Sequence, residues 1–405
     1  MSQYDRCSPN SACACFHIAG AINIGICGDE FVDCSALITC EQSSNVCHEP
    51  NHRCVHHPRC RNLSVCYPIP SFNQQLCPPI APMHTTTSTT TTTTNSIQQL
   101  GMIPNIPVNA QWRKNGVTVA GGLQHGGAIN QLQNPHGIFV DDDQTMIIAD
   151  WGNARIVQWQ LNDTKGQVIA GGNGHGSRLD QLYDPTSVLI DKEMDNLIIC
   201  DRVNRRVVQW SRHPNTTQGE ILIDNIPCRG VAMDNQRYLY VADEEKHEVR
   251  RYQIGDKNGT IVAGGNGNGT SLNQLSRPGY IFVDREQTVY ISDNYNFRVV
   301  KWNKDAQEGT VVAGGHGKGN ALTQFAYPRG VFVDTLHTIY VADAHNHRVI
   351  RWPKEAKEGT IIVGGNGEGR EANQLRYPEG LFFDRYGNLY VADNGNNRVQ
   401  RFFIE

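Results

Sequence analysis

The sequence predicts an all-β protein: a six-bladed β-propeller closed by an N-terminal strand, preceded by a small disulfide-rich module and a disordered Thr-rich linker. Three observations lead to this prediction. One unit of 43 to 50 residues is repeated six times from residue 135 onward. Eleven of the 13 cysteines lie within the first 77 residues, and nine threonines with one serine fill residues 85–94. We therefore divide the chain into a Cys-rich module (residues 1–80), a linker (81–96) and a propeller (97–405).

The N-terminal cysteines indicate a disulfide framework, because such a density is typical of small secreted modules. Zinc binding and a reduced cytosolic module are the alternatives. No Cys-x-x-Cys pair occurs among these residues, so the short ligand spacing of zinc knuckles is missing. The disulfide candidates are Cys7, Cys13, Cys15, Cys27, Cys34, Cys40, Cys47, Cys54, Cys60, Cys66 and Cys77.

The Thr-rich run cannot bury a hydrophobic core. We interpret it as a mucin-like, O-glycosylated stalk, with a bare flexible linker as the alternative. Five Asn-x-Ser/Thr sequons are candidates for N-glycosylation. They are at Asn62, Asn162, Asn215, Asn258 and Asn268.

Disulfides and glycans together predict an extracellular or cell-surface location. Residues 1–15 are polar, and the apolar stretch 18–26 is interrupted by Asn23, so a signal-peptide core is not recognisable. We expect that the sequence lacks its true N-terminus; otherwise the inferred compartment is wrong. No stretch approaches 18 consecutive apolar residues, so we expect no membrane span.

Each repeat contains short β-branched runs separated by turn residues, which indicates four strands and no long helix. In the fifth repeat the strands read GVFVD, TIYVAD, HRVIRW and GTIIVGG. The sixth repeat ends after its third strand, whereas VTVAGG at residues 117–122 is a fourth-type strand with no repeat before it. We expect this strand to complete the last blade and remove the open edge.

Recurrent side chains assign roles within the repeats. An aromatic residue in each third strand is a core candidate, and an Asp that ends each first strand is a turn cap. The aromatic residues are Trp159, Trp210, Tyr252, Trp302, Trp352 and Phe402, and the caps are Asp141, Asp191, Asp234, Asp284, Asp334 and Asp384.

The turn between the second and third strands carries the pattern Asp-x-x-Asn-x-Arg in five repeats. We expect the Asp to accept turn N–H groups, the Asn to occupy a left-handed position, and the Arg to return beside the Asp. The third repeat departs from the pattern, with Lys246 and Glu248 in the Asn and Arg places. The predicted structural turn residues are Asp150, Asn153, Arg155, Asp201, Asn204, Arg206, Asp293, Asn296, Arg298, Asp343, Asn346, Arg348, Asp393, Asn396 and Arg398.

The pattern Pro-x-Gly-(apolar)3-Asp, followed by Tyr-Val-Ala-Asp-x-x-Asn-x-Arg-Val-x-aromatic, resembles the NHL repeat family of six-bladed propellers over roughly residues 117–405. This resemblance implies the fold. It leaves the activity open, because the family includes interaction scaffolds, RNA-binding regulators, sensor domains and a zinc-dependent lyase. The N-terminal module resembles no family that we can name.

Gly-rich loops such as GGNGHGSRLDQL precede five of the repeats. Their Gly-x-Gly spacing is also found in phosphate cradles, but a cradle needs a following helix, and here another strand follows. The Leu or Phe near the end of each loop is expected to anchor it on the core. The third repeat has no such loop, since DNIPCRG joins its strands directly.

The residue after the Pro that opens each repeat, or after Cys228 in the third repeat, should surround the central channel, on the face that carries the Gly-rich loops. Its residues are His136, Thr186, Arg229, Gly279, Arg329 and Glu379, with Tyr280 adjacent. The lyase of this family uses channel histidines as zinc ligands, but this ring offers only one imidazole and one carboxylate. We therefore expect no zinc, no calcium and no cofactor. A solvated polar mouth is the simplest interpretation; a small anion or peptide carboxylate held by Arg229 and Arg329 is the other.

These observations predict a non-catalytic interaction protein. Residues 97–405 hold 32 basic and 34 acidic side chains, so we expect no nucleic acid partner. The Gly-rich-loop face, with side chains such as His125, His175, Lys318, Glu368 and Tyr280, is the predicted site for a protein or peptide ligand. A divergent propeller enzyme, either an amidating lyase or a hydrolase with a channel metal, is the alternative.

Two cysteines lie outside the module. Cys200 precedes the Asp at the end of a second strand, and Cys228 opens the next repeat, so both fall toward the same face of adjacent blades. A disulfide between them is possible. The alternative is a small buried thiol, which suits Cys200 because Ala or Ser stands in this place in the other repeats.

Overall fold

The computed structural model describes residues 13–17, 25–29, 52–56, 64–68 and 103–405. The chain divides into two compact units, residues 1–93 and 94–405. The described part of the first unit consists of two antiparallel hairpins, β1 (Cys13–His17) with β2 (Gly25–Asp29) and β3 (His52–His56) with β4 (Ser64–Pro68).

The strand register of these hairpins places cysteine positions opposite one another, Cys15 opposite Cys27 and Cys54 opposite Cys66. Cys66 is buried and disulfide-bonded. The predicted Thr-rich linker, the sequon at Asn62 and several disulfide candidates lie outside the described residues. Those candidates are Cys7, Cys34, Cys40, Cys47, Cys60 and Cys77.

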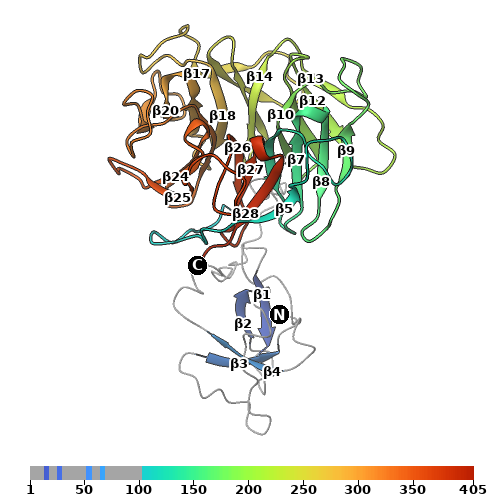
Figure 1. Ribbon diagram of the computed structural model, residues 1–405, viewed down its shortest axis with the longest axis vertical. Coiled ribbons are helices and arrows are strands. Elements are labelled where there is room, and N and C mark those ends of the chain that lie inside the picture. The colour runs from blue at the N-terminus through green and yellow to red at the C-terminus, as the bar shows by residue number, and fades with distance from the viewer. Residues whose placement is uncertain (1–12, 18–24, 30–51, 57–63, 69–102) are drawn as a thin grey trace, which may run out of the picture. The chain divides into compact units, whose positions relative to one another are not determined.

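The second unit is a ring of six four-stranded antiparallel sheets, which confirms the predicted propeller (Figure 1). In blades one to five the strands run outward from the channel in chain order. Blade one is β6 (Pro135–Val140), β7 (Met146–Asp150), β8 (Arg155–Trp159) and β9 (Gln167–Gly171); blade two is β10 (Pro185–Asp191), β11 (Asn196–Asp201), β12 (Arg206–Ser211) and β13 (Glu220–Ile223); blade three is β14 (Cys228–Met233), β15 (Tyr238–Asp243), β16 (Glu248–Gln253) and β17 (Thr260–Gly264). Blade four is β18 (Pro278–Val283), β19 (Val289–Asp293), β20 (Arg298–Trp302) and β21 (Thr310–Gly314); blade five is β22 (Pro328–Val333), β23 (Ile339–Asp343), β24 (Arg348–Trp352) and β25 (Thr360–Gly364).

Blade six combines the two ends of the propeller chain. It contains β26 (Pro378–Phe383), β27 (Leu389–Asp393) and β28 (Arg398–Phe402), and its outer strand is β5 (Val117–Gly121). β5 pairs antiparallel with β28, with Ala120 opposite Val399, and Figure 1 shows the two strands side by side. The predicted closure is therefore confirmed.

Residues before β5 fasten this closure from the face opposite the Gly-rich loops. Trp112 is buried beside Phe383, and its Nε1 donates a hydrogen bond to the Gly387 carbonyl at 2.9 Å, in the turn between β26 and β27. Ile106 is also buried in this cluster. The entering chain thus packs against blade six before its outer strand begins.

The core lies between neighbouring blades. The third-strand aromatic residues are at most 5% exposed, as predicted. The Asp caps also behave as predicted: Asp334 Oδ1, for example, accepts the backbone N–H groups of Leu336 at 2.9 Å and Thr338 at 2.8 Å. Within the described residues no helix has the length and apolar character needed to span a membrane.

Candidate functional site

Each Gly-rich loop is held by a buried ion pair beside the turn between the second and third strands of the blade that the loop enters. In blade five, Arg348 Nε donates to Asp343 Oδ2 at 2.8 Å, and both side chains are buried. The other guanidinium nitrogens donate to the carbonyl oxygens of Asn320, Ala321 and Gln324 in the preceding loop. We call this Asp-Asn-Arg arrangement the loop clamp. Its other members are Asp150, Asn153 and Arg155; Asp201, Asn204 and Arg206; Asp293, Asn296 and Arg298; and Asp393, Asn396 and Arg398.

Two details differ from the sequence-based expectation. The clamp Asp does not accept turn N–H groups in these five blades but an N–H of the preceding loop, as Asp343 Oδ1 does from Ala326 at 2.7 Å. The left-handed residue is not the Asn but the one after it, for example His347 with φ of 53°. The Asn346 amide instead donates to Asp343 and to the Gly319 carbonyl. Both differences have one cause: the Asp and Asn side chains form hydrogen bonds with the backbone of the preceding loop rather than with the backbone of their own turn.

Blade three lacks both the loop and the clamp. Only residues 224–227 connect β13 to β14. Asp243 here accepts turn N–H groups, from Glu245 and Lys246, and Glu248 pairs with Arg250 at 2.6 Å. The Asn and Arg positions have thus lost the loop carbonyls that they bind in the other blades.

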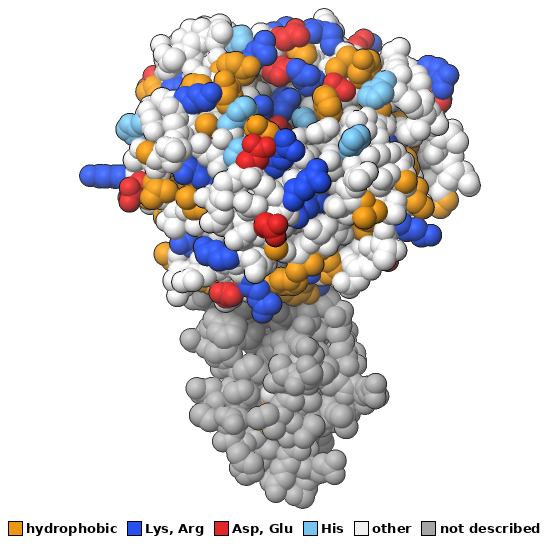
Figure 2. Space-filling view, viewed as in Figure 1, with side chains coloured by type: hydrophobic (Ala, Val, Ile, Leu, Met, Phe, Trp, Pro, Cys, Tyr) orange, Lys and Arg blue, Asp and Glu red, His pale blue; other side chains and the backbone are white. Residues whose placement is uncertain are grey.

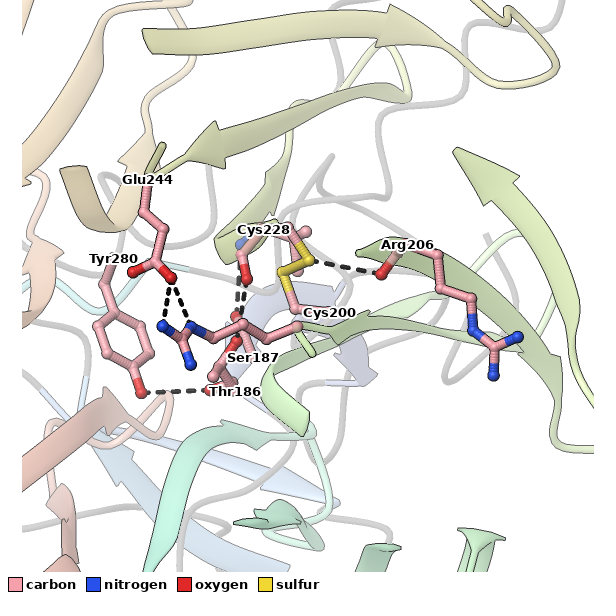
Figure 3. The surroundings of a disulfide bond; sticks show 9 residues. Thr186, Ser187, Cys200, Arg206, Cys228, Glu244 and Tyr280 are labelled. Carbon is pink, nitrogen blue, oxygen red and sulfur yellow. Dashed lines mark hydrogen bonds and ion pairs between the residues drawn. A yellow bond between two sulfur atoms is a disulfide. The ribbon is translucent and has the colours of Figure 1, made fainter. Parts of the chain in front are cut away.

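A disulfide joins blade two to blade three at this same junction (Figure 3). Cys200 of β11 and Cys228 of β14 are both fully buried, with Cα atoms 5.6 Å apart, a separation typical of disulfides. Of the two interpretations left open by the sequence, the structure shows the disulfide.

The channel end on the Gly-rich-loop face is closed by a polar cluster. We call His136, Thr186, Arg229, Tyr280, Arg329 and Glu379 the channel cluster. Glu379 pairs with both arginines: Arg229 Nη2 donates a hydrogen bond to Oε2 at 3.2 Å, and Arg329 Nε lies 3.3 Å from Oε1 as an ion pair. Each residue is placed by the start of an innermost strand, and the six strands converge on the propeller axis.

The expectation of a solvated mouth is wrong for this cluster. His136, Thr186, Arg229, Tyr280 and Glu379 are at most 9% exposed, and the Arg329 side chain is 18% exposed. Tyr280 was expected to be an exposed rim residue. It is instead 7% exposed, and its hydroxyl donates to the Thr186 carbonyl of blade two at 3.2 Å (Figure 3).

An exchange of two residues in blade four explains this position of Tyr280. Blades one, three, five and six have Gly as the third residue of the innermost strand. A Cβ at Gly230 would lie 2.7 Å from the Gly279 carbonyl of the neighbouring strand, so this position is tightly restricted. Blade four has Gly279 in the ring position and Tyr280 after it. The aromatic side chain therefore extends across the channel below the ring.

Electrostatics leave the channel cluster positively charged. Burial raises the pKa of Glu379, but the nearby guanidiniums, Arg329 foremost, outweigh this effect and lower the pKa to about 2. Burial lowers the pKa of His136 to about 3, so its imidazole is neutral at pH 7. Two guanidiniums and one carboxylate leave one positive charge in the cluster. Three buried nitrogens of the cluster have no hydrogen-bond partner among the described residues: His136 Nδ1, Arg229 Nε and Arg329 Nε.

A second ring covers the cluster and was not anticipated. It consists of the residue after the last Asp of each second strand. Trp151 stacks on His136 with ring centres 5.3 Å apart, and Arg202 pairs with Glu244. The ring is Trp151, Arg202, Glu244, Asn294, Ala344 and Asn394. The sequence did contain a signal for this ring, because the residue at this position varies between repeats that are otherwise regular.

An aromatic cluster over blades four to six was also missed. Tyr327 contacts Tyr295, Phe297 and His345, with ring centres 4.6 to 5.6 Å apart, and Lys318 Nζ lies 4.6 Å from its ring centre. His345 in turn contacts Tyr377. We call Tyr295, Phe297, Tyr327, His345 and Tyr377 the aromatic rim. Tyr327 and Tyr377 precede the first Pro of their blades and have left-handed φ values of 59° and 48°.

The remaining surface predictions concern exposure. His125, His175, Lys318 and Glu368 are exposed on the Gly-rich loops, as expected. The sequon at Asn268 is exposed on the same loops, whereas Asn162, Asn215 and Asn258 are exposed in turns between third and fourth strands, at the opposite face. Basic and acidic side chains are interspersed over the side of the propeller seen in Figure 2.

The chemistry that the site offers is anion binding. Its donors are guanidinium groups in a largely desolvated setting, where charge-assisted hydrogen bonds are strong. Within the described residues, no three His, Cys, Asp or Glu side chains are grouped closely enough to hold a metal ion.

The comparisons with known proteins agree with the fold. The sequence model of the NHL repeat matches residues 325–352 and 375–402, in blades five and six. No curated protein sequence matches the chain. Among solved structures, a protein of unknown function from Bacteroides thetaiotaomicron has a TM-score of 0.57 at 16% identity, over 72% of this chain and 76% of that chain.

Two further solved structures are similar at low identity. An auxiliary nutrient binding protein from the same organism has a TM-score of 0.56 at 14% identity, over 73% of this chain and 77% of that chain. A gluconolactonase from Xanthomonas campestris has a TM-score of 0.51 at 12% identity, over 72% of this chain and 99% of that chain. The second unit of this chain is a six-bladed β-propeller whose fifth and sixth blades match the NHL repeat.

Proposed function

We propose that this protein is a non-catalytic, extracellular or cell-surface interaction protein whose propeller binds a protein or peptide ligand on the Gly-rich-loop face. The observation that carries the proposal is the excess positive charge of the channel cluster, with Glu379 shared between Arg229 and Arg329. A ligand carboxylate would balance that charge. We therefore assign the cluster to a carboxylate of the ligand, most simply the C-terminal one.

The loops around the cluster support recognition of a larger partner. The loop clamps fix the loop backbone through buried donors, and a preordered loop loses little conformational entropy on binding. The aromatic rim supplies large side chains that bind with few rotatable bonds, beside the cation of Lys318. Together they form a rigid surface with an anion site at its centre.

The extracellular location has its own support. The Cys200–Cys228 disulfide favours an oxidising compartment. The four sequons within the described residues are all exposed and so accessible to glycosylation. Mass analysis of protein secreted by eukaryotic cells, before and after enzymatic removal of N-glycans, tests this part. Glycan-free protein retained inside the cell would contradict it.

The fold alone does not separate binding from catalysis, since the similar structures include a nutrient binding protein and a gluconolactonase. The proposed absence of catalysis is tested by metal analysis of the purified protein and by lactone hydrolysis assays. Stoichiometric channel zinc or calcium, or turnover that is lost in a cluster variant, would favour the divergent enzyme instead.

The binding proposal is tested with a peptide library displayed with free C-termini and, in parallel, with amidated C-termini. Peptides that bind should lose at least about tenfold in affinity on amidation and a similar factor in the Arg329→Gln variant. Arg285→Gln, at an exposed position on the opposite face, is the matched control and should bind normally. If amidated peptides bind equally well, the cluster does not recognise a carboxylate. If only Arg285→Gln weakens binding, the ligand uses the other face.

A further inference from the structure

Below the channel cluster, the propeller channel is lined by apolar side chains. The fifth residue of the innermost strand lines it in every blade. In blades four, five, six and one this residue is Phe, and neighbouring rings touch with centres 5.0 to 5.6 Å apart. The six residues are Phe139, Leu189, Ala232, Phe282, Phe332 and Phe382.

Blade three breaks this ring of large side chains. Ala232 stands where four blades have Phe, and a cavity of about 140 Å³ remains in the channel next to it. Its lining includes the aromatic rings of Phe139, Phe282 and Phe382 and the side chain of Met233. Polar groups of the lining have partners of their own: Ser187 Oγ accepts the Val231 N–H, and the Tyr280 hydroxyl donates to the Thr186 carbonyl. The charged residues of the lining are Asp141 and Asp142, which pair with Lys192, and Arg385, which donates to the Tyr386 hydroxyl.

The two ends of this cavity differ. The channel cluster blocks the end on the Gly-rich-loop face, where Tyr280 lines the cavity. At the other end the lining reaches Asp141 and Asp142, which follow the first strand of blade one, and Ile103 of the entering chain. Access is therefore from the face opposite the one assigned to the protein ligand.

We propose that this channel cavity binds an uncharged single-ring aromatic molecule. Apolar cavities of roughly 150 Å³ hold no water and take up molecules of the size of benzene, so the volume fits one ring. The surrounding Phe rings offer edges and faces for tilted aromatic contacts. Lining polar groups that already have partners would leave a strongly polar or charged ligand without compensation for its lost hydration. This site is independent of the function proposed for the opposite face.

Toluene is the probe, and filling the cavity is the test. In the full-length protein, toluene should bind in calorimetry and raise the midpoint of thermal unfolding. Ala232→Phe places in blade three the side chain that four other blades carry, and should weaken toluene binding at least about tenfold. Ala321→Phe adds the same ring at an exposed loop position and is the matched control, with toluene binding unchanged.

A smaller replacement and a larger probe complete the experiment. Ala232→Leu copies blade two and decides the question if the Phe variant fails to fold; it too should weaken toluene binding. Naphthalene exceeds the volume and should bind more weakly than toluene. The proposal is overturned if toluene does not bind the wild type, or if both Ala232 variants bind it as tightly as the wild type does.

Discussion

Cys200 and Cys228 are bonded across the boundary between blades two and three, where the Gly-rich loop and the loop clamp are both missing. In the other blades, the clamp fastens the turn between second and third strands to the chain segment that enters the blade. At this junction the disulfide makes a covalent connection in the same region. The disulfide therefore takes the place of the loop clamp, which the short connection at residues 224–227 cannot form.

The double variant Cys200→Ala, Cys228→Ala should lose about 2–4 kcal/mol of unfolding free energy, because the bond restricts a 28-residue loop in the unfolded chain. Urea unfolding followed by tryptophan fluorescence measures this. The variant is a cleaner test than a reductant, which would also act on disulfides of the N-terminal unit. A midpoint equal to that of the wild type would show that the bond constrains nothing.

Removing the arginine of a loop clamp should lower the free energy of unfolding strongly. Arg348→Met leaves the buried carboxylate of Asp343 without its charge partner and three loop carbonyls without donors, so we expect a loss of about 3–5 kcal/mol. Amide exchange should become faster in the loop 315–327. Arg178→Met breaks an exposed pair with Asp180 and is the control; because solvent screens this pair, the free energy of unfolding should hardly change. Similar losses in both variants would mean that the clamp adds nothing beyond an ordinary surface pair.

Acidification should destabilise the propeller through His136. The pKa of His136 is about 3 in the folded protein, below the ordinary value of 6.5. Between pH 3 and pH 6.5 the imidazole is therefore protonated in the unfolded chain but neutral in the folded protein. Stability is lost as the pH falls from 6.5 towards 3, by about 1.4 kcal/mol per pH unit. His136→Gln should remove this contribution. Urea midpoints of the two proteins between pH 7 and 4.5 should converge at low pH; parallel curves would refute the prediction.

Glu379 should contribute a second loss at lower pH. Its folded-state pKa of about 2 lies below the ordinary 4.5, so its contribution is complete above pH 4.5 and disappears as the pH falls from 4.5 to 2. Glu379→Gln should therefore be less stable than the wild type at pH 6 and approach it near pH 2. Intrinsic fluorescence at graded urea concentrations follows both proteins. A constant difference over this range would exclude coupling to the carboxylate.

Deleting residues 96–122 removes β5 together with the Trp112 anchor, and leaves the edge of β28 unpaired. We expect this variant to unfold or to self-associate. Deleting residues 1–95 should leave the propeller folded and monodisperse in light scattering. Equal behaviour of the two truncations would contradict the closure seen in blade six.

The repeat pattern was sufficient to predict the blades, the closure and the turn caps, because each depends on local spacing that recurs. The channel cluster was harder. Arg229 and Glu379 are 150 positions apart, and their pairing depends on how side chains from different blades fill one axis. Sequence reasoning placed both at the mouth but treated them as solvated. From the sequence we predicted an exposed Tyr280, but the structure buries it. The exchange of Gly and Tyr in blade four puts Tyr at the third position of the strand, where four blades have Gly, and the space at that position is limited by the backbone of the neighbouring innermost strand. The aromatic rim was missed because its members belong to different loops and turns.

The clamps have a consequence for how the binding face can change. Arg206, Arg298 and Arg348 each bind the same loop position through its carbonyl oxygen, and that position carries Ser177, Thr270 or Asn320. A backbone acceptor is the same whichever side chain follows, so the loop keeps its course while its outward residues are replaced. Substitutions at the outward-facing positions of these five loops, in evolution or in a randomised display library, can therefore change which ligand is bound without disturbing the fold of the loops.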